Sequence, residues 1–183
     1  EYEKTFMPFC LLSKKRYVGN LYEEDPDKFA LKSMGIVLKR RDNAPIVKVI
    51  YGGIIDIIMK EQDIKPSINF LLRSLRNLVN GQYGLDTLII TKTLSSYYKD
   101  PDRIAHKVLA DRMAERDPGN KPQVNDRIPF VYIDTSHIKN KRGMLQGDKI
   151  ETPQYVRDNN LSPDYEFYIT NQILKPVSQI FGL

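Results

Sequence analysis

The first part of the chain has the hydrophobic pattern of strands. Aromatic and aliphatic residues dominate positions 2–18 and are followed by turn-prone Gly19-Asn20, which predicts one or two strands. Residues 20–32 are polar around Asp25-Pro26-Asp27 and favour a turn or the start of a short helix. The apolar run at residues 35–38 is a further candidate strand.

From residue 45 onward the spacing of apolar residues becomes helical. Pro45 suits the first turn of a helix that runs to about Gln62. Gly52-Gly53 lies inside it and costs about 1 kcal/mol per glycine relative to alanine, so a close backbone contact or a kink is expected there. Pro66 begins a second helix, which Asn80-Gly81 ends. The apolar positions of the second helix are expected to point inward, with Arg73 and Arg76 on the other face: Ile68, Leu71, Leu72, Leu75, Leu78 and Val79.

Two more strands and two more helices are expected after residue 85. Residues 87–91 and 128–134 have the composition and alternation of strands. A third helix is predicted to begin with Asp100 as its cap and Pro101 at its first position. A last helix is predicted from Ser162-Pro163 toward Ile180, with Pro176 bending or ending it. Together the elements predict an α+β fold, in which a short β piece precedes a mostly helical region with small strands.

Composition narrows the class of protein. The chain has 183 residues, 41% of them hydrophobic, which is enough for one good core or two small ones. The net charge of +5 is compatible with a nucleic-acid partner. Cys10 has no second cysteine to pair with, which fits a reducing, intracellular setting. No apolar run is long enough to span a membrane, and no signal peptide is recognisable. The opening Glu1-Tyr2, without methionine, favours a piece of a longer polypeptide.

Catalytic chemistry is poorly represented. The paired carboxylates Asp25/Asp27 and Asp100/Asp102 flank prolines, where capping explains them better than metal binding. A single cysteine cannot supply a zinc site, and no glycine-rich phosphate loop is present. His106 falls on the third helix, where a polar-face position is the simpler interpretation. We therefore assign no catalytic residue and no metal ligand, and we expect this chain alone to be inactive.

Three polar clusters suggest binding instead. Lys14, Lys15, Arg16 and Tyr17 follow an apolar run, and strand alternation would place Lys15 and Tyr17 on one face. A second basic cluster, residues 39–41, follows soon after. Thr91-Lys92-Thr93 opens a hydroxyl-rich segment, predicted to be a loop, of the kind that commonly contacts phosphates. The alternative, in which these charges are merely solvated, remains open from spacing alone.

At these residues the chain resembles the palm and thumb of family B DNA polymerases, nearest the delta type and its large-DNA-virus relatives. The matching segments occur in the family's order over nearly the whole chain: residues 3–19 with the lysine-x-tyrosine motif, 35–43, 90–94, 106–113, 124–131 and 165–176. The resemblance implies residues 1–37 as the C-terminal part of the palm and residues 38–183 as the thumb. The zinc-binding cysteines that follow the thumb in cellular delta polymerases are absent, which favours a large-DNA-virus source. The sequence of the insertion-like segment at residues 135–154 favours the same source.

The resemblance also implies partners and roles. Lys15 and Tyr17 would contact the minor groove and sugar-phosphate near the primer end, and Arg40, Arg41 and residues 91–93 would contact the primer backbone. The expected DNA-binding set is Lys14, Lys15, Arg16, Tyr17, Arg40, Arg41, Thr91, Lys92, Thr93 and His106. Primer-template DNA, the remainder of the polymerase and a processivity factor would be the partners, in a nucleus or a viral replication compartment. Mg²⁺ is expected in the complete polymerase but not in this segment. Two alternatives stay open: a stand-alone basic helical module that binds nucleic acid or acts as a scaffold, and an accessory chain of a split polymerase.

Overall fold

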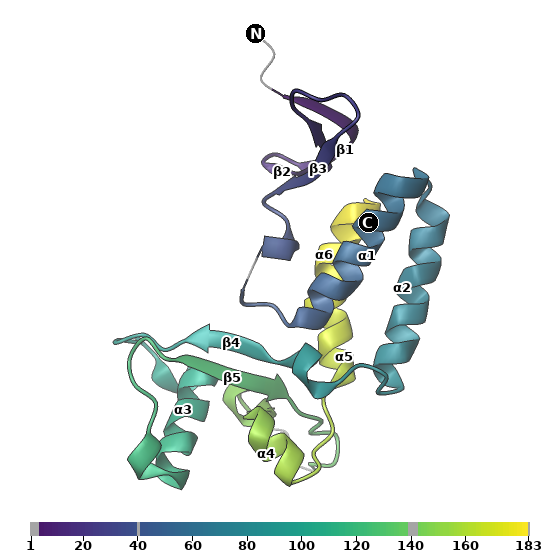
Figure 1. Ribbon diagram of the computed structural model, residues 1–183. Coiled ribbons are helices and arrows are strands. Elements are labelled where there is room, and N and C mark those ends of the chain that lie inside the picture. Colours follow the sequence, from purple (N-terminus) through teal and green to yellow (C-terminus); the bar gives the residue numbers. More distant parts are fainter. Residues whose placement is uncertain (1–3, 40, 139–142, 183) are drawn as a thin grey trace.

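The computed structural model describes residues 4–39, 41–138 and 143–182 (Figure 1). Two small antiparallel sheets lie at opposite ends of the molecule, and helices pack between them. The expected α+β class is therefore confirmed. None of the described helices combines the length and apolar content that crossing a membrane requires.

The first sheet is built from three consecutive strands. It contains β1 (Thr5–Ser13), β2 (Arg16–Tyr22) and β3 (Phe29–Met34), in the order β1-β2-β3. The sequence prediction missed β3, because residues 20–32 look polar and this strand has almost no buried side chain. It forms by full backbone pairing with β2, from Tyr22↔Phe29 to Tyr17↔Met34. Such pairing is a tertiary effect that local composition does not encode.

The strand predicted at residues 35–38 is wrong. Gly35 has φ of +66° and ends β3, and a 3-10 helix, η1 (Val37–Lys39), follows it. A Cβ at Gly35 would lie 2.3 Å from the carbonyl oxygen of Lys15, so this position accepts only glycine without a shift of the β1–β2 turn. Ile36 is buried in the core and carries the chain from the sheet to the helices.

Helix α1 (Pro45–Glu61) is the centre of the core. Its first-turn proline is where the sequence predicts it, and α1 ends one residue before the expected position. Seven of its side chains are buried: Ile46, Val47, Ile50, Tyr51, Ile54, Ile55 and Met59. They pack within one apolar cluster that includes residues from both sheets and from the C-terminal segment. Each end of the molecule is therefore attached to the same helix.

Helix α2 (Ile64–Val79) returns alongside α1, and Asp63 caps it by accepting a hydrogen bond from the backbone N–H of Lys65. The predicted inward face is partly wrong, because Ile68, Leu72 and Val79 are exposed. The buried positions are Ser67, Leu71, Ser74 and Leu78. Helix α2 contacts α1 through a narrow stripe that includes two small serines. The prediction placed every apolar residue of α2 on the inward face and therefore overestimated the width of this stripe. Arg73 and Arg76 are exposed, as expected.

The second sheet is formed by β4 (Ile90–Thr93), β5 (Arg127–Tyr132) and the short β6 (Ile150–Glu151), in the order β4-β5-β6. The strand predicted at residues 87–91 is displaced, because Leu85–Leu88 is the 3-10 helix η2. Residues 91–93 consequently belong to a strand and not to the expected loop. Helices α3 (Ala105–Arg116) and α4 (Pro153–Asp158) lie beside this sheet, and further 3-10 turns occur at Pro101–Arg103, Pro118–Asn120 and Gln146–Lys149.

Helix α2 begins at Ile64, two residues before the predicted Pro66, and two other helix starts lie later than predicted. Pro101 begins only a 3-10 turn, η3, whose Asp100 makes no side-chain capping bond, and α3 starts at Ala105. The last helical segment starts at Tyr165 and not at Ser162-Pro163, because Asp164 provides the cap by accepting from the backbone N–H of Phe167. In both places a proline marks the approach to a helix, and the helix proper begins later.

The C-terminal segment is one continuous helical stretch with a wide turn inside it. It runs from α5 (Tyr165–Phe167) through a π-helix, η6 (Tyr168–Ile173), into α6 (Leu174–Phe181). Pro176 does not end the helix. Proline has no N–H to donate four residues back, and the π-turn just before α6 is one way for a helix to accommodate that missing bond.

Gly53 confirms the close contact expected inside α1, and Gly52 provides a matched control. A Cβ at Gly53 would lie 2.4 Å from the Phe70 ring of α2, whereas a Cβ at Gly52 would meet Leu38 at an ordinary 3.5 Å. We expect Gly53→Ala to lower the free energy of unfolding by about 1–2 kcal/mol after its gain in helix propensity. Gly52→Ala should raise it by about 0.5–1 kcal/mol. Urea unfolding measures both, and equal stabilisation by the two alanines would contradict the tight α1–α2 contact.

Candidate nucleic-acid interface

Lys14 and Lys15 form the turn of the β1–β2 hairpin. Ser13 pairs with Arg16, so the two lysines are the two residues between the strands. Lys15 has φ of +63°, in the left-handed region, and both side chains are exposed. The expected strand alternation at Lys15 is therefore wrong, because a turn residue does not follow the two-residue period of a strand. The turn instead presents two neighbouring ammonium groups at the tip of the hairpin.

Arg16 and Tyr17 leave β2 toward opposite sides. The Tyr17 ring contacts the rings of Phe6 and Phe9 on β1, with centroid distances of 5.7 and 5.6 Å. The Arg16 guanidinium turns toward α6, where its Nη1 donates to Oε1 of Gln179 at 3.0 Å. Tyr17 is thus supported by an aromatic cluster, while Arg16 links the hairpin to the C-terminal helix.

A second cluster joins β4 to the segment that precedes α1. Nζ of Lys92 lies 3.2 Å from Oδ2 of Asp42. The Arg127 guanidinium, at the start of β5, donates to Oγ1 of Thr91 at 3.2 Å and to the carbonyl oxygen of Arg41 at 3.4 Å. It also donates to Oγ1 of Thr93 at 3.4 Å. Arg41, Thr91, Lys92 and Thr93 therefore meet as one surface, whereas Arg40 lies outside the described residues.

His106 has a different environment from the other predicted residues. It is half-buried, and its Nε2 lies 3.0 Å from the Tyr98 hydroxyl, which accepts a hydrogen bond from the backbone N–H of Ser95. Burial lowers the pKa of His106, and the nearby Lys92 cation lowers it further. A backbone hydrogen bond at Thr93 acts in the opposite direction and raises the pKa, but the net shift is downward. The geometry makes His106 a support for residues 95–98.

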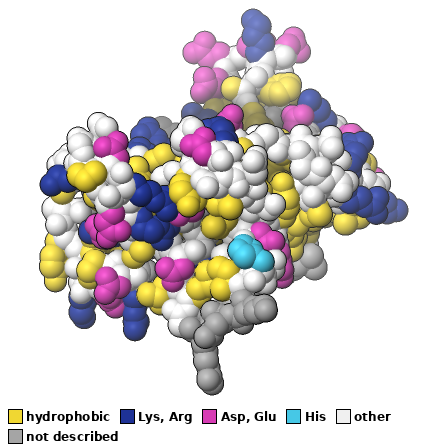
Figure 2. Space-filling model, turned by 90° about the horizontal axis from the view of Figure 1, so that it is seen from below, with side chains coloured by type: hydrophobic (Ala, Val, Ile, Leu, Met, Phe, Trp, Pro, Cys, Tyr) yellow, Lys and Arg dark blue, Asp and Glu magenta, His cyan; other side chains and the backbone are white. Residues whose placement is uncertain are grey.

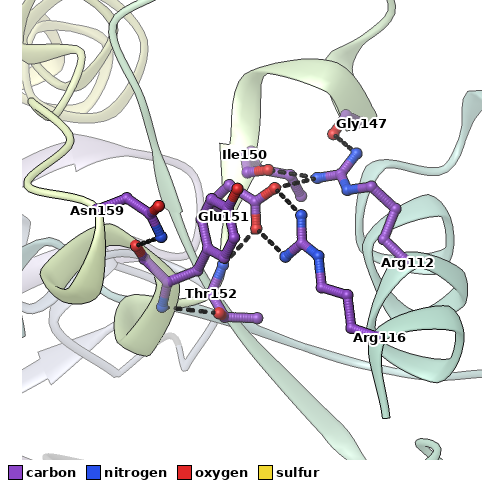
Figure 3. Close-up of polar contacts among 8 residues, drawn as sticks. Arg112, Arg116, Gly147, Ile150, Glu151, Thr152 and Asn159 are labelled. Carbon is purple, nitrogen blue, oxygen red and sulfur yellow. Dashed lines mark hydrogen bonds and ion pairs between the residues drawn. The ribbon is translucent and has the colours of Figure 1, made fainter. Parts of the chain in front are cut away.

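A buried ion cluster holds α3 against β6 (Figure 3). Glu151 is only 6% exposed, and Arg116 donates to both of its carboxylate oxygens at 3.0 and 2.9 Å. Arg112 lies 3.3 Å from the same carboxylate and donates to the carbonyl oxygens of Gly147 and Ile150. Hydrogen bonding to Glu151 raises the pKa of Arg116, whose guanidinium also lies 4.1 Å from the ring centroid of Tyr155. These arginines are therefore structural.

Sequence reasoning missed the two residues that organise these clusters. Arg127 lies within the matching segment 124–131 but is not among the expected DNA-binding residues, and its position across from Thr91 and Thr93 depends on β4–β5 pairing. Glu151 lies 35 residues from Arg116, a separation that no local pattern reveals. The available signal was weak, namely an arginine directly before the strand predicted at residues 128–134.

Within the described part of the chain, no three His, Cys, Asp or Glu side chains come together as metal ligands would. Oδ1 of Asp25 accepts from the backbone N–H of Asp27, and this bond, with the ion pair to Lys28, lowers the pKa of Asp25. Asp100 pairs with Arg103 in its own turn. Both aspartates have local structural roles.

Charge is distributed in small groups. Figure 2 shows the face seen from below, where Lys and Arg side chains gather in several groups with Asp and Glu side chains between them. Several cations among the described residues are in ion pairs with nearby carboxylates, such as Lys60 with Asp56 and Arg157 with Asp86. Any contact with a polyanion on this protein therefore depends on particular cations and not on overall charge.

Comparison with known proteins identifies the family. Residues 1–183 match the sequence model of the family DNA polymerase family B, and the chain belongs to this family. It is 64% identical over its full length to the DNA polymerase of Pyramimonas orientalis virus and 61% identical to that of Acanthamoeba polyphaga mimivirus. It is also 36% identical, over 99% of its length, to the DNA polymerase delta catalytic subunit of Candida albicans. The expected likeness to delta-type and viral polymerases is thus confirmed.

The fold agrees with a solved relative. The family B DNA polymerase from the archaeon Pyrobaculum calidifontis matches 94% of this chain and 21% of its own with a TM-score of 0.69, at 19% sequence identity. That likeness concerns the fold alone. The chain spans only 15% and 10% of the two viral polymerases and 17% of the Candida protein.

His106 should make stability depend on pH. Its pKa is lower in the folded chain than in the unfolded chain, so the unfolded state binds more protons as pH falls below about 6.5. Stability contributed by neutral His106 is present above that pH and is lost as pH falls toward the folded pKa. Urea midpoints at pH 7.5 and 5.5 should differ more for the wild type than for His106→Gln. An identical pH dependence in the two proteins would contradict this assignment.

The Glu151 cluster should be costly to break. Glu151→Ala leaves two arginines without their shared partner, and we expect it to lower the free energy of unfolding by about 2–4 kcal/mol, less than a fully buried pair because Arg116 is partly exposed. Glu115→Ala, an exposed change on the same helix, should stay within about 0.5 kcal/mol of wild type. Thermal and urea unfolding measure the difference, and a similar small effect at both positions would show that the cluster contributes little.

Proposed function

We propose that this chain forms the C-terminal part of the palm (residues 1–37) and the thumb (residues 38–183) of a DNA-directed DNA polymerase. Its role is to hold the primer–template duplex during template-directed synthesis. The proposal is supported by family membership over residues 1–183 and by the exposed two-lysine turn of the β1–β2 hairpin. The break between the first sheet and η1 lies close to the proposed boundary at residues 37–38.

The hairpin tip has the chemistry for a contact that is independent of sequence. In the minor groove every base pair offers acceptors at purine N3 or pyrimidine O2, so an ammonium donor can bind any correctly shaped pair. Lys14 and Lys15 supply two such donors on a short, rigid hairpin. Tyr17 lies just behind the turn, where Phe6 and Phe9 limit the movement of its ring. In this proposal Lys15 and Tyr17 act at the primer end.

The β4 cluster has the chemistry for backbone contacts. Arg41, Thr91, Lys92 and Thr93 combine cations with hydroxyl groups, the usual donors to phosphate oxygens. Arg127 holds the two threonines and the Arg41 carbonyl oxygen together, so these groups are positioned before DNA arrives. Lys92 pairs with Asp42 in the free protein, and both side chains are partly exposed. A phosphate would compete with Asp42 for this ammonium group.

The chemical step is assigned to other parts of the polymerase. Phosphoryl transfer in DNA polymerases uses two metal ions held by converging carboxylates, and the described residues contain no such group. Mg²⁺ would therefore be bound by the remaining palm, while this chain binds and orients the duplex. The rest of the polymerase and a processivity factor are the partners that this role implies. Family membership argues against a stand-alone scaffold module, and it leaves a split-polymerase subunit as a variant of the same role.

Salt-dependent binding tests the proposed grip. We expect the chain to bind unrelated DNA duplexes without sequence preference, with a log–log salt slope of about −3 to −5. Replacing both turn lysines, as Lys14→Gln with Lys15→Asn, should reduce the slope by about 0.9 for each lysine that contacts a phosphate. Asparagine is used at position 15 because it tolerates the left-handed backbone there.

The matched control replaces two exposed cations on the outer face of α2, Lys65→Gln with Arg73→Gln, and should leave the slope unchanged. Fluorescence anisotropy over a range of salt concentrations gives both slopes. Equal losses in the two double variants would mean that duplex binding follows net charge, and the assignment of the hairpin to DNA would then fail.

A further inference from the structure

A polar cleft separates the first sheet from the C-terminal helix. It has a volume of about 240 Å³ and lies between Arg16 on β2, Asn43 before α1, and the C-terminal residues Asn171, Gln172, Lys175 and Gln179. The remaining lining residues, Gly35, Ile36, Val37, Tyr51 and Pro176, bring no acidic side chain. The cleft therefore combines two cations with four amides, and no carboxylate faces them from the described residues.

The two cations of the cleft have unusual partners. Arg16 donates to the amide oxygen of Gln179, and Nζ of Lys175 donates to the amide oxygen of Asn171 at 3.0 Å. By contrast, many other cations of the chain pair with carboxylates, as Lys60 does with Asp56. A neutral amide holds a cation in place without cancelling its charge. Arg16 and Lys175 are thus positioned but not neutralised, which leaves a local positive potential.

Gln172 also lines the cleft and carries a polar atom without a partner. Its Oε1 is buried and has no hydrogen-bond partner among the described residues. A buried amide group without a partner costs free energy, so native proteins almost always provide one. Gln172 lines the cleft, and its amide NH₂ group can donate to an anion there.

We propose that this cleft binds a phosphate group between Arg16 and Lys175, with the Gln172 amide as an additional donor. A phosphate offers several acceptor oxygens around one centre, which suits donors that arrive from different elements. A guanidinium presents its N–H groups in a fork that matches phosphate oxygens. The Gln179 bond uses Nη1 of Arg16, so the rest of the fork has no other partner among the described side chains.

The site is separate from the proposed duplex contact of Tyr17. Arg16 faces the cleft and α6, whereas Tyr17 faces Phe6 and Phe9 on the other side of β2. A phosphate in the cleft is therefore not the one next to Tyr17. The inference goes beyond the proposed duplex grip and does not depend on it. Its ligand is either a phosphate of a nucleic-acid backbone or a small phosphate such as pyrophosphate.

Nuclear magnetic resonance can test the cleft directly. The side-chain amide signals of Asn171, Gln172 and Gln179 in the folded chain report on the cleft alone. The probes are inorganic phosphate, pyrophosphate and a short DNA duplex, each titrated separately. We expect phosphate-bearing probes to shift the Gln172 amide, and Arg16→Gln or Lys175→Gln to weaken that binding about tenfold each. Lys65→Gln and Arg73→Gln are the matched controls and should leave it unchanged.

The outcomes separate the ligand sources. Shifts with pyrophosphate or inorganic phosphate support a small phosphate, and shifts with duplex alone support a backbone phosphate. Because Lys175 is exposed on α6, Lys175→Gln remains a valid test if Arg16→Gln disturbs the hairpin. The proposal is overturned if no probe shifts Gln172, or if both cleft variants bind as tightly as the controls. A polyglutamate peptide that binds more tightly than every phosphate probe would also overturn it. If the salt-dependence experiment showed that the hairpin lysines do not contact DNA, the NMR test of the cleft would still stand.

Discussion

The whole fold depends on the burial of one helix. Helix α1 buries residues on most of its circumference, against the first sheet, α2 and the C-terminal segment. At about 1.5–3 kcal/mol for each large apolar side chain, its seven buried residues provide a large share of the stabilisation that links these elements. The second sheet also packs against α3 and α4. Helix α1 thus belongs to the same apolar cluster as residues of both sheets and of the C-terminal segment.

Local sequence signals predicted the elements whose pattern is strong. Proline at position 45 and regular apolar spacing were enough for α1, and alternation was enough for β5. They failed where a tertiary contact decides the structure. Strand β3 exists through pairing with β2, and Lys15 occupies a turn because Ser13 pairs with Arg16. Of the predicted site, the structure brings Arg41, Thr91, Lys92 and Thr93 together on one surface, and their role in DNA binding stays a prediction. The sequence could not show that Arg16 turns to α6, that His106 supports Tyr98, or that Arg127 organises the threonines, because each depends on distant residues.

The chain uses its cations in three physically different ways. Arg112 and Arg116 pair with the buried carboxylate of Glu151 and contribute to stability. Lys92 pairs with Asp42 at the surface, where solvent screening keeps the pair weak and exchangeable. Arg16 and Lys175 are held by neutral amides, and Lys14 and Lys15 point into solvent from a turn. A net charge of +5 conceals these differences, so the partners of each cation are more informative than the total.

The bond between Arg16 and Gln179 spans 163 residues and has a consequence for biosynthesis. The Tyr168 hydroxyl acts similarly: it donates to the carbonyl oxygen of Leu88 and accepts from the backbone N–H of Tyr132 inside the core. Both sheets thus complete their contacts only with residues near the end of this stretch. During synthesis on the ribosome, the two sheets are fully stabilised only after α6 has emerged from the exit tunnel. A nascent chain arrested before Tyr168 would expose the part of α1 that the C-terminal segment covers and become a substrate for chaperones.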